Sequence, residues 1–237
     1  MSTLALQSAT SSTILTTLLT QVGSTDNPSP PLSTSCDLII SDLRRLADLL
    51  AQHSKRLAYE NWCWSTHAPD WSHVWSICQS VDRPNFGLCL DTFQTAGGEW
   101  ADPSTSTGLL EGKSKEQADA DLRKSLVRLA KEVPGDKIYL LQISDAYKLT
   151  KPITEADEEG LRPRGRWSHD FRPLPFSGGY LPIVDVARAV LETGFRGWFS
   201  YEVFDSGPDG RGKSVDLEDF AMEAKRAQGR LLEECAK

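Results

Sequence analysis

The sequence predicts an α/β fold in which helices cover a parallel sheet. Short apolar runs alternate along the chain with stretches whose Leu, Ile and Val residues recur at helical spacing. The apolar runs are hydrophobic throughout instead of alternating with polar residues, which is typical of parallel strands buried on both faces. A chain of 237 residues is long enough for one large domain with a sizeable core.

The amino-terminal part of the chain contains the first predicted elements. Residues 14–22 (ILTTLLTQV) are rich enough in Leu, Ile, Val and Thr for a strand, although Ser, Thr and Pro surround them. Residues 36–55 place Leu and Ile at helical spacing and predict a helix. The apolar run RLAYE at 56–60 predicts the next strand.

The same alternation continues to the carboxyl terminus. Each further apolar run is preceded or followed by a stretch with helical periodicity, so the pattern predicts repeated strand and helix pairs. The predicted strands are 85–91 (NFGLCLD), 137–142 (KIYLLQ) and 197–202 (GWFSYE), and the predicted helices are 70–81, 116–132, 182–193 and a last one from about 216.

Composition and charge exclude several classes of protein. The net charge of -7 argues against a nucleic-acid-binding surface, which needs a basic face. The five cysteines are scattered without CxxC spacing, so reduced thiols are expected instead of disulfides or a zinc site. Neither a secretory signal nor a run of about 20 apolar residues is found. We therefore expect a cytoplasmic protein with no nucleic-acid or membrane partner.

Four successive predicted strands end in a side chain that carries an oxygen atom: Glu60, Asp91, Gln142 and Glu202. In a (β/α) barrel such ends converge on one mouth, where the active site is built. Three carboxylates gathered there would repel one another unless a cation lay between them. Oxygen-rich sets suit Mg or Mn, with Co possible. A single acid at a strand end is more often a helix cap or a solvated group, so the metal prediction depends on all four together.

Several segments also resemble a known family. AYENWCWSTHAPDW, VDRPNFGLCLDTFQTAGGEWADP, LLQISDA and GGYLPIVDVARAVLETGFRGWFSYEVF look like the fungal 3-dehydroshikimate dehydratases of quinate catabolism, members of the xylose-isomerase-like TIM-barrel superfamily. The resemblance implies dehydration of 3-dehydroshikimate to protocatechuate, with a divalent metal polarising the substrate carbonyl. It assigns the metal to Glu60, Asp91, Gln142 and Glu202, the same four residues.

The resemblance also implies further site residues. His67 corresponds to a residue that lines the substrate pocket, and Arg172 matches an arginine able to pair with the substrate carboxylate. Gln94 stands where bacterial relatives carry a histidine that is a candidate base, and an amide cannot take that proton at neutral pH. Three more residues are expected near the substrate: Asp145, Lys148 and Trp64. The glycines of TAGGEW are expected to be loop hinges and not a phosphate cradle, because no GxGxxG follows a strand.

The predicted barrel is incomplete. A full barrel has eight strands, whereas about five are found here, corresponding to strands four to eight of the family. We expect a poorly ordered segment at 1–13 and a single partial TIM-barrel-like domain at 14–237. An open sheet exposes an apolar edge, so a homo-oligomer is one possible completion.

Two alternatives to a dehydratase stay open. The first is a sugar or sugar phosphate isomerase or epimerase of the same superfamily, which shares the metal site. The second is a non-catalytic remnant that keeps the metal-binding residues, an alternative favoured by the missing units and by Gln94. Formation of a catechol from 3-dehydroshikimate would separate these alternatives from the dehydratase.

Overall fold

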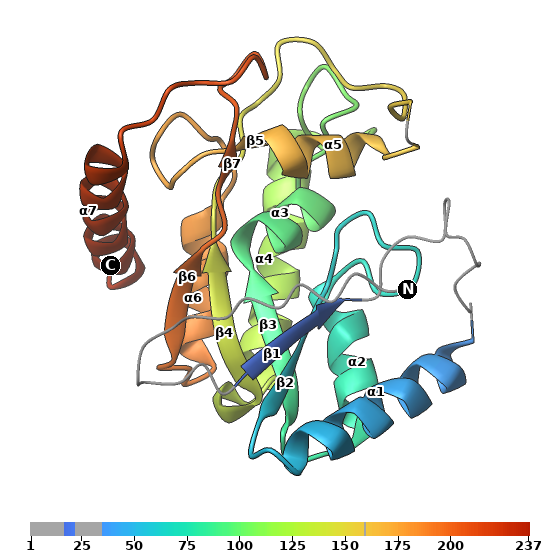
Figure 1. Ribbon diagram of the computed structural model, residues 1–237. Helices are drawn as coiled ribbons and strands as arrows, with labels where there is room; N and C mark the ends of the chain where they lie inside the picture. Colours follow the sequence, from blue (N-terminus) through green and yellow to red (C-terminus); the bar gives the residue numbers. More distant parts are fainter. Residues whose placement is uncertain (1–16, 22–34, 159) are drawn as a thin grey trace.

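A sheet of five parallel strands forms the centre of the protein (Figure 1). The computed structural model describes residues 17–21, 35–158 and 160–237. Neighbouring strands follow one another in chain order, and every neighbouring pair is parallel. The strands are β1 (Thr17–Gln21), β2 (Arg56–Glu60), β3 (Phe86–Asp91), β4 (Ile138–Ile143) and β6 (Trp198–Tyr201). The predicted α/β class and the positions of all five strands are therefore confirmed.

Four helices cover one face of this sheet (Figure 1). Strand residues such as Leu57, Leu88 and Leu141 join helix residues such as Val74 and Leu126 in one buried cluster. Burying these side chains is the main stabilising contribution to the fold. The four helices are α1 (Cys36–Ala51), α2 (Trp71–Val81), α4 (Lys115–Glu132) and α6 (Ile183–Glu192), all within a few residues of their predicted bounds.

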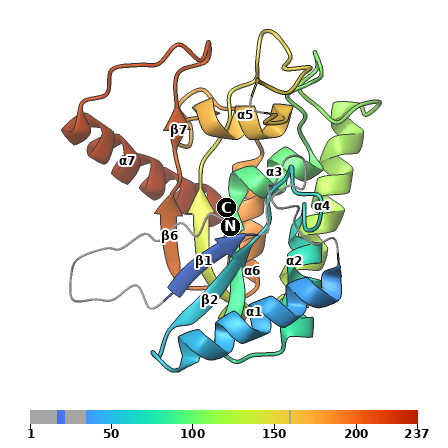
Figure 2. The ribbon, with the colours of Figure 1, turned by 45° about the vertical axis from the view of Figure 1, so that its right-hand side comes forward.

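The last helix, α7 (Leu217–Cys235), packs against α6 and buries only Ala227 and Leu231 along its length. It begins at Asp216, whose carboxylate accepts hydrogen bonds from the first free N–H groups of the helix. The predicted helix from about 216 is thus confirmed. Figure 2 shows α7 beside the sheet, on the side where β6 forms its edge.

The opposite face of the sheet carries a much smaller apolar cluster. Ala58, Cys89 and Tyr139 form it, with Leu140 packed against them, and all four residues belong to strands. Gly87 is required here, because a Cβ at this position would lie 2.7 Å from the ring of Tyr139. Among the described residues, no strand pairs with the outer edge of β1 or of β6.

Short elements that the sequence did not predict lie over the carboxyl ends of the strands (Figures 1 and 2). They are α3 (Thr92–Glu99), α5 (Pro163–Asp170), β5 (Phe171–Arg172) and β7 (Phe204–Asp205), and a 3-10 turn (Gly135–Lys137) precedes β4. Strands β5 and β7 pair antiparallel, which joins the segment after β4 to the segment after β6.

The expectation that the glycines of TAGGEW are loop hinges is wrong. Gly97 and Gly98 both lie inside α3. A Cβ on Gly97 would lie 3.2 Å from Trp167, and one on Gly98 would lie 3.1 Å from Cβ of Cys63. These glycines therefore allow α3 to pack closely against its neighbours, and a glycine pair alone does not distinguish this use from a hinge.

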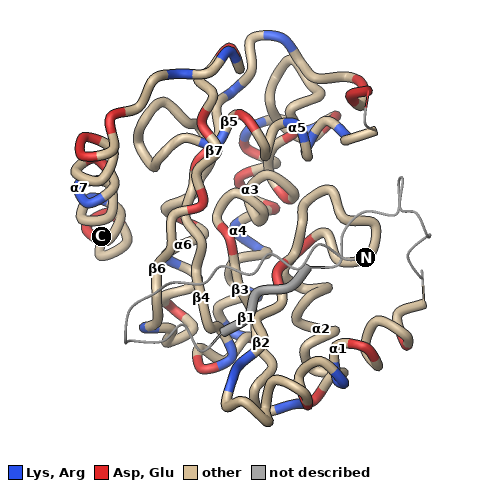
Figure 3. The backbone as a smooth tube through the Cα atoms, viewed as in Figure 1, with Lys and Arg blue, Asp and Glu red and all other residues tan. Residues whose placement is uncertain are grey.

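Three further expectations from the sequence concern the amino-terminal segment, membrane-spanning helices and the distribution of charge. The segment 1–13 lies outside the described residues. Within the described part, no helix is long and apolar enough to cross a membrane. Figure 3 shows basic and acidic positions interspersed along the helices and loops, without a division into one basic and one acidic side.

Candidate metal site

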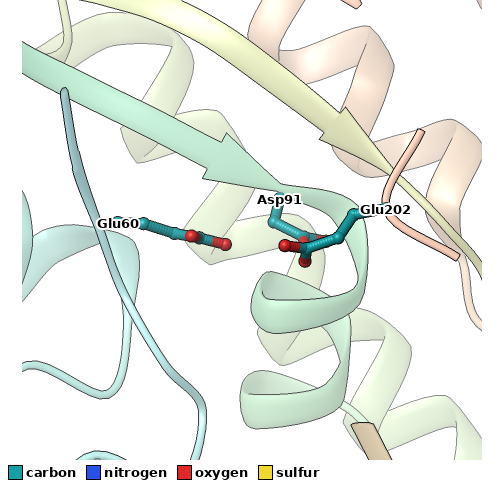
Figure 4. Close-up of side chains that lie close together, drawn as sticks. All are labelled: Glu60, Asp91 and Glu202. Carbon is teal, nitrogen blue, oxygen red and sulfur yellow. The ribbon is translucent and has the colours of Figure 1, made fainter. Parts of the chain in front are cut away.

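Three carboxylates from three strand ends meet at the carboxyl edge of the sheet. Glu60 ends β2, Asp91 ends β3, and Glu202 directly follows β6. One oxygen of each carboxylate lies within 4.8 Å of the others, and Figure 4 shows the three side chains directed toward one another. Glu60 and Asp91 are buried and Glu202 is partly buried. At this spacing two carboxylates repel by roughly 3 kcal/mol for an effective dielectric constant of about 20. This acidic cluster could hold a metal ion.

The sheet register explains why these residues meet. Glu60 pairs with Cys89 and Asp91 pairs with Gln142, so each successive strand carries its oxygen-bearing residue to the same edge. Because side chains alternate between the two faces, residues two apart such as Cys89 and Asp91 share a face. The interpretation that the four strand ends converge is confirmed for the three acids.

Asp91 also begins helix α3. Its Oδ1 accepts hydrogen bonds from the N–H groups of Phe93 at 2.6 Å and Gln94 at 3.3 Å. Burial raises the pKa of Asp91, the guanidinium of Arg172 opposes this shift, and the charge of Glu202 adds to it. The helix cap therefore fixes the direction of one oxygen, while the second oxygen, Oδ2, faces Arg172.

Arg172 lies among the carboxylates and is 1% exposed. Its Nη2 is 2.5 Å from Oδ2 of Asp91, and its Nη1 is 2.8 Å from Oε2 of Glu202. Nε donates to Ser144 at 2.9 Å, and Nη1 donates to Ser168 at 3.3 Å. Burial lowers the pKa of Arg172, but the charges of Asp91, Glu202 and Glu60 outweigh it and raise the pKa overall. Its charge therefore compensates part of the acidic cluster.

The contacts of Arg172 bear on the expectation that it grips a substrate carboxylate, which stays a prediction. Three N–H groups of the guanidinium donate to Ser144, Ser168 and Asp91, and the ion pair with Glu202 engages the same Nη1. An arginine offers five N–H donors in all. A two-pronged contact with a substrate would break the existing contacts in a fully buried place.

Gln142 lies at the same edge and bridges two neighbours. Its Nε2 donates to Oε1 of Glu202 at 3.1 Å, and its Oε1 is 3.3 Å from Sγ of Cys89. Burial, followed by the charge of Glu60, raises the pKa of Cys89, so this residue stays a neutral thiol. In this arrangement Gln142 orients Glu202. Its direct binding of a metal through the amide oxygen stays a prediction.

His67 and Trp64 lie in the loop between β2 and α2. Nε2 of His67 is screened from solvent and has no hydrogen-bond partner among the described residues, while its backbone N–H donates to Ser65. Trp64 is buried, stacks on Trp62 with ring centroids 5.1 Å apart, and meets His169 edge-on. Their contacts with substrate stay predictions.

Gln94 lies in α3 and is buried. Its Oε1 accepts a hydrogen bond from the backbone N–H of Cys63 at 3.0 Å. This contact ties α3 to the loop that carries His67 and Trp64. The structure therefore gives Gln94 a role in holding the loop, and a catalytic role stays a prediction.

Asp145 and Lys148 follow β4 but differ in environment. Asp145 is buried, and its Oδ1 accepts from the N–H groups of Ala146 at 2.8 Å and Leu181 at 2.9 Å. Burial raises the pKa of Asp145 to about 6, and these backbone donors oppose the shift. Asp145 thus connects two loop segments, whereas Lys148 is exposed. Substrate contact by either residue stays a prediction.

Sequence reasoning missed three residues around the acidic cluster: Ser144, Ser168 and Cys89. Cys89 could have been found, because it lies two residues before Asp91 on the same face of one strand. Ser144 follows Gln142 by two residues and could have been found by the same rule. No sequence signal pointed to Ser168, since the helix that carries it was not predicted.

A parallel sheet with acidic residues gathered at its carboxyl edge is consistent with a (β/α) barrel, in which the active site is built at that edge. The family model described as "xylose isomerase-like TIM barrel" matches residues 12–225, and the chain belongs to this family. Among curated proteins, the chain is 37% identical over 216 residues to a 3-dehydroshikimate dehydratase of Neurospora crassa. It is 29% identical over 170 residues to a 3-dehydroshikimate dehydratase of Pseudomonas aeruginosa. The similarity to fungal dehydratases that the sequence segments indicate is thereby confirmed.

The matches differ in coverage. The Neurospora match includes 87% of this chain and 58% of the relative, and the Pseudomonas aeruginosa match includes 72% and 21%. The chain therefore spans little more than half the length of the first relative and a fifth of the second.

Solved structures show the same fold. A xylose isomerase-like TIM barrel/4-hydroxyphenylpyruvate dioxygenase fusion protein superposes with a TM-score of 0.67 at 24% identity, covering 92% of this chain and 28% of that one. The IOLI protein with a bound zinc atom gives 0.60 at 19% identity, covering 91% and 62%. A Mycobacterium smegmatis xylose isomerase-like TIM barrel protein in complex with magnesium gives 0.51 at 16% identity, covering 92% and 62%.

Proposed function

We propose that this chain carries the divalent-metal site of a 3-dehydroshikimate dehydratase, which forms protocatechuate in quinate and shikimate catabolism. The observation that carries the proposal is the meeting of Glu60, Asp91 and Glu202 at the carboxyl edge of the sheet. Active sites of (β/α) barrels are built at this edge. The identity of 37% to the Neurospora dehydratase supports the choice of reaction.

The charges of the cluster fit a divalent ion. Glu60, Asp91 and Glu202 carry three negative charges when ionised, and Arg172 supplies one positive charge through its ion pairs. A buried excess of two negative charges is costly unless a cation compensates it. Carboxylate oxygens are preferred ligands of Mg and Mn, and Co is a further candidate. The zinc and magnesium named for two proteins of the same fold support a divalent ion.

Glu60, Asp91 and Glu202 would hold this metal, with Gln142 as the fourth ligand. Rotation of the Gln142 amide by half a turn exchanges its oxygen and nitrogen, which would direct the oxygen toward Glu202. Bound there, the metal would polarise the substrate carbonyl. Asp91 keeps its orientation through the N–H groups that begin α3.

His67 is the proposed proton acceptor. Dehydration requires removal of a proton from the carbon next to the carbonyl and return of that proton to the neighbouring hydroxyl group, which then leaves as water. Nε2 of His67 is screened from solvent and makes no hydrogen bond to the described residues, so it is available to accept that proton. Trp64 and Lys148 are proposed to contact the ring and the carboxylate of the substrate.

We infer that catalysis needs more of the barrel than the described strands supply. Five strands form an open sheet, whereas an enclosed mouth positions the substrate from several strands and excludes water. The missing walls could come from further βα units or from a second copy of the chain. The chain alone should then bind metal and turn over 3-dehydroshikimate slowly.

An assay of catechol formation from 3-dehydroshikimate tests the proposal. Protein fused behind a relative's first three βα units, before residue 14, should form protocatechuate with Mn. Addition of a chelator or the Glu60→Gln change should abolish this activity. Metal binding without catechol formation in that fusion would contradict the dehydratase assignment, and conversion of a sugar phosphate instead would favour the isomerase alternative.

A further inference from the structure

The guanidinium of Arg172 connects two carboxylates that would otherwise repel each other. Asp91 belongs to β3 and Glu202 follows β6, and Arg172 contacts both from β5. The side chain is held in place by Ser144 and Ser168 and lies over the ring of Phe93, 4.4 Å from its centroid. Such a fixed and dry position suits an internal ion pair better than a group that must exchange water for substrate.

We propose that Arg172 acts as the internal counter-cation of the acidic cluster. In the metal-free protein it offsets the repulsion between Asp91 and Glu202, and in the metal-bound protein it shares the neutralisation of the cluster with the metal. This inference rests on the metal site of the proposed function. Three carboxylates, one guanidinium and one divalent ion add up to zero net charge, so Arg172 and the metal can be present together.

The charge balance has a measurable consequence. When Arg172 is absent, three negative charges depend on the metal alone, and the metal-free protein loses stability. The metal then stabilises the fold more than in the wild type, because it also no longer meets a neighbouring positive charge. Arg172 and the metal are therefore expected to be negatively coupled.

Thermal unfolding and calorimetric titration with Mn can measure this coupling in three proteins. In the wild type, Mn should raise Tm. In Arg172→Gln, the metal-free Tm should fall, the rise with Mn should be larger, and the Mn affinity should increase about tenfold, corresponding to about 1.4 kcal/mol. Arg172→Lys keeps the charge, so its rise with Mn should resemble that of the wild type.

Arg164→Gln is the matched control. Arg164 is a partly buried arginine that, like Arg172, has a carboxylate partner, Asp102, and it donates to the carbonyl oxygens of Gly97 and Ala101. Its loss should lower Tm without changing the rise with Mn. Equal rises in the wild type and in Arg172→Gln would overturn the inference.

Two further outcomes are decisive. If Arg172→Gln does not fold without metal, the double variant Arg172→Gln/Glu202→Gln should recover the ability to fold, since a carboxylate is removed together with its counter-ion. A failure to recover folding overturns the inference.

If Mn leaves the Tm of the wild type unchanged, the metal site of the proposed function fails. The metal-free comparison of the single and double variants then still decides the role of Arg172.

Discussion

Leu88 and Asp91 lie three residues apart on β3, and both are fully buried, yet their surroundings differ in kind. Leu88 belongs to the helix-covered face, where apolar side chains from strands and helices pack together. Asp91 belongs to the carboxyl edge, where it meets Glu60, Glu202 and Arg172. Burial of Leu88 stabilises the fold whether or not a cation is bound, whereas burial of the Asp91 carboxylate is costly unless cations compensate its charge. The helix-covered face therefore stabilises the fold, whereas the carboxyl edge lowers its stability unless a cation is bound.

The largest expected effect lies on the helix-covered face. Leu88→Ala removes a fully buried side chain and should lower the free energy of unfolding by about 2 to 5 kcal/mol. Urea unfolding with and without Mn measures it. The stabilisation by Mn should equal that of the wild type, since no ligand is touched. A changed response to Mn would show that the two regions are not independent.

Glu60→Gln, at the carboxyl edge, should weaken Mn binding without lowering the stability of the metal-free protein. Loss of one charged ligand should weaken Mn binding about 100-fold, which corresponds to about 2.7 kcal/mol. The metal-free protein should become no less stable, because one of three mutually repelling charges is gone. Calorimetric titration and unfolding in a chelator provide the two measurements. Unchanged Mn affinity would remove Glu60 from the ligand set.

Substitution of Gln94 tests whether the carboxyl edge also contains polar groups with a purely structural role. Gln94→Ala leaves the backbone N–H of Cys63 buried without its acceptor and should cost about 2 kcal/mol of stability. Mn affinity should be unaffected. If stability is retained while activity of the barrel-completed fusion is lost, Gln94 is a catalytic residue and not a loop tether.

The stability contributed by Asp145 should depend on pH. Its pKa is raised by burial to about 6 from 3.8, so the folded state binds the proton more tightly than the unfolded state. This contribution is fully present below about pH 4 and is lost as pH rises through about 6. Asp145→Asn keeps an acceptor for Ala146 and Leu181 and should therefore be about 1 to 2 kcal/mol more stable than the wild type near pH 7. Unfolding measured from pH 4 to 8 should show that gain vanishing in acid.

The smallest effect is expected outside both regions. Ser114 begins α4 with a capping box, in which its side chain accepts from the N–H of Gln117 and the Gln117 side chain accepts from the N–H of Ser114. Ser114→Ala should cost about 1 kcal/mol, seen in urea unfolding. The stabilisation by Mn should equal that of the wild type. A loss of stability well above this value would mean that α4 contributes more to the stability of the fold than its apolar face indicates.

The sequence predicted the scaffold well because its signals are local. Buried strands such as 86–91 and amphipathic helices such as 36–51 show their periodicity within a short window. The short elements over the carboxyl edge were missed for the same reason. Helix α3 starts directly at the end of β3 and contains two glycines, and α5 has little apolar periodicity. Helix α3 instead packs against residues distant in the sequence, Cys63 and Trp167, the second of which belongs to α5.

By itself, the sequence determined the order of strands and helices and the oxygen-bearing residue at the end of each of four strands. Hydrogen-bonding geometry imposes a period on each element, and parallel strands bring their carboxyl ends to one edge whatever the loops do. Only the tertiary structure decided that Arg172 joins Asp91, 81 residues away along the chain, and that Gln142 bridges Glu202 and Cys89. Those contacts depend on how β5, β7 and α3 pack over the strand ends. The same packing sets the balance of buried charge, and a local sequence pattern contains no information about it.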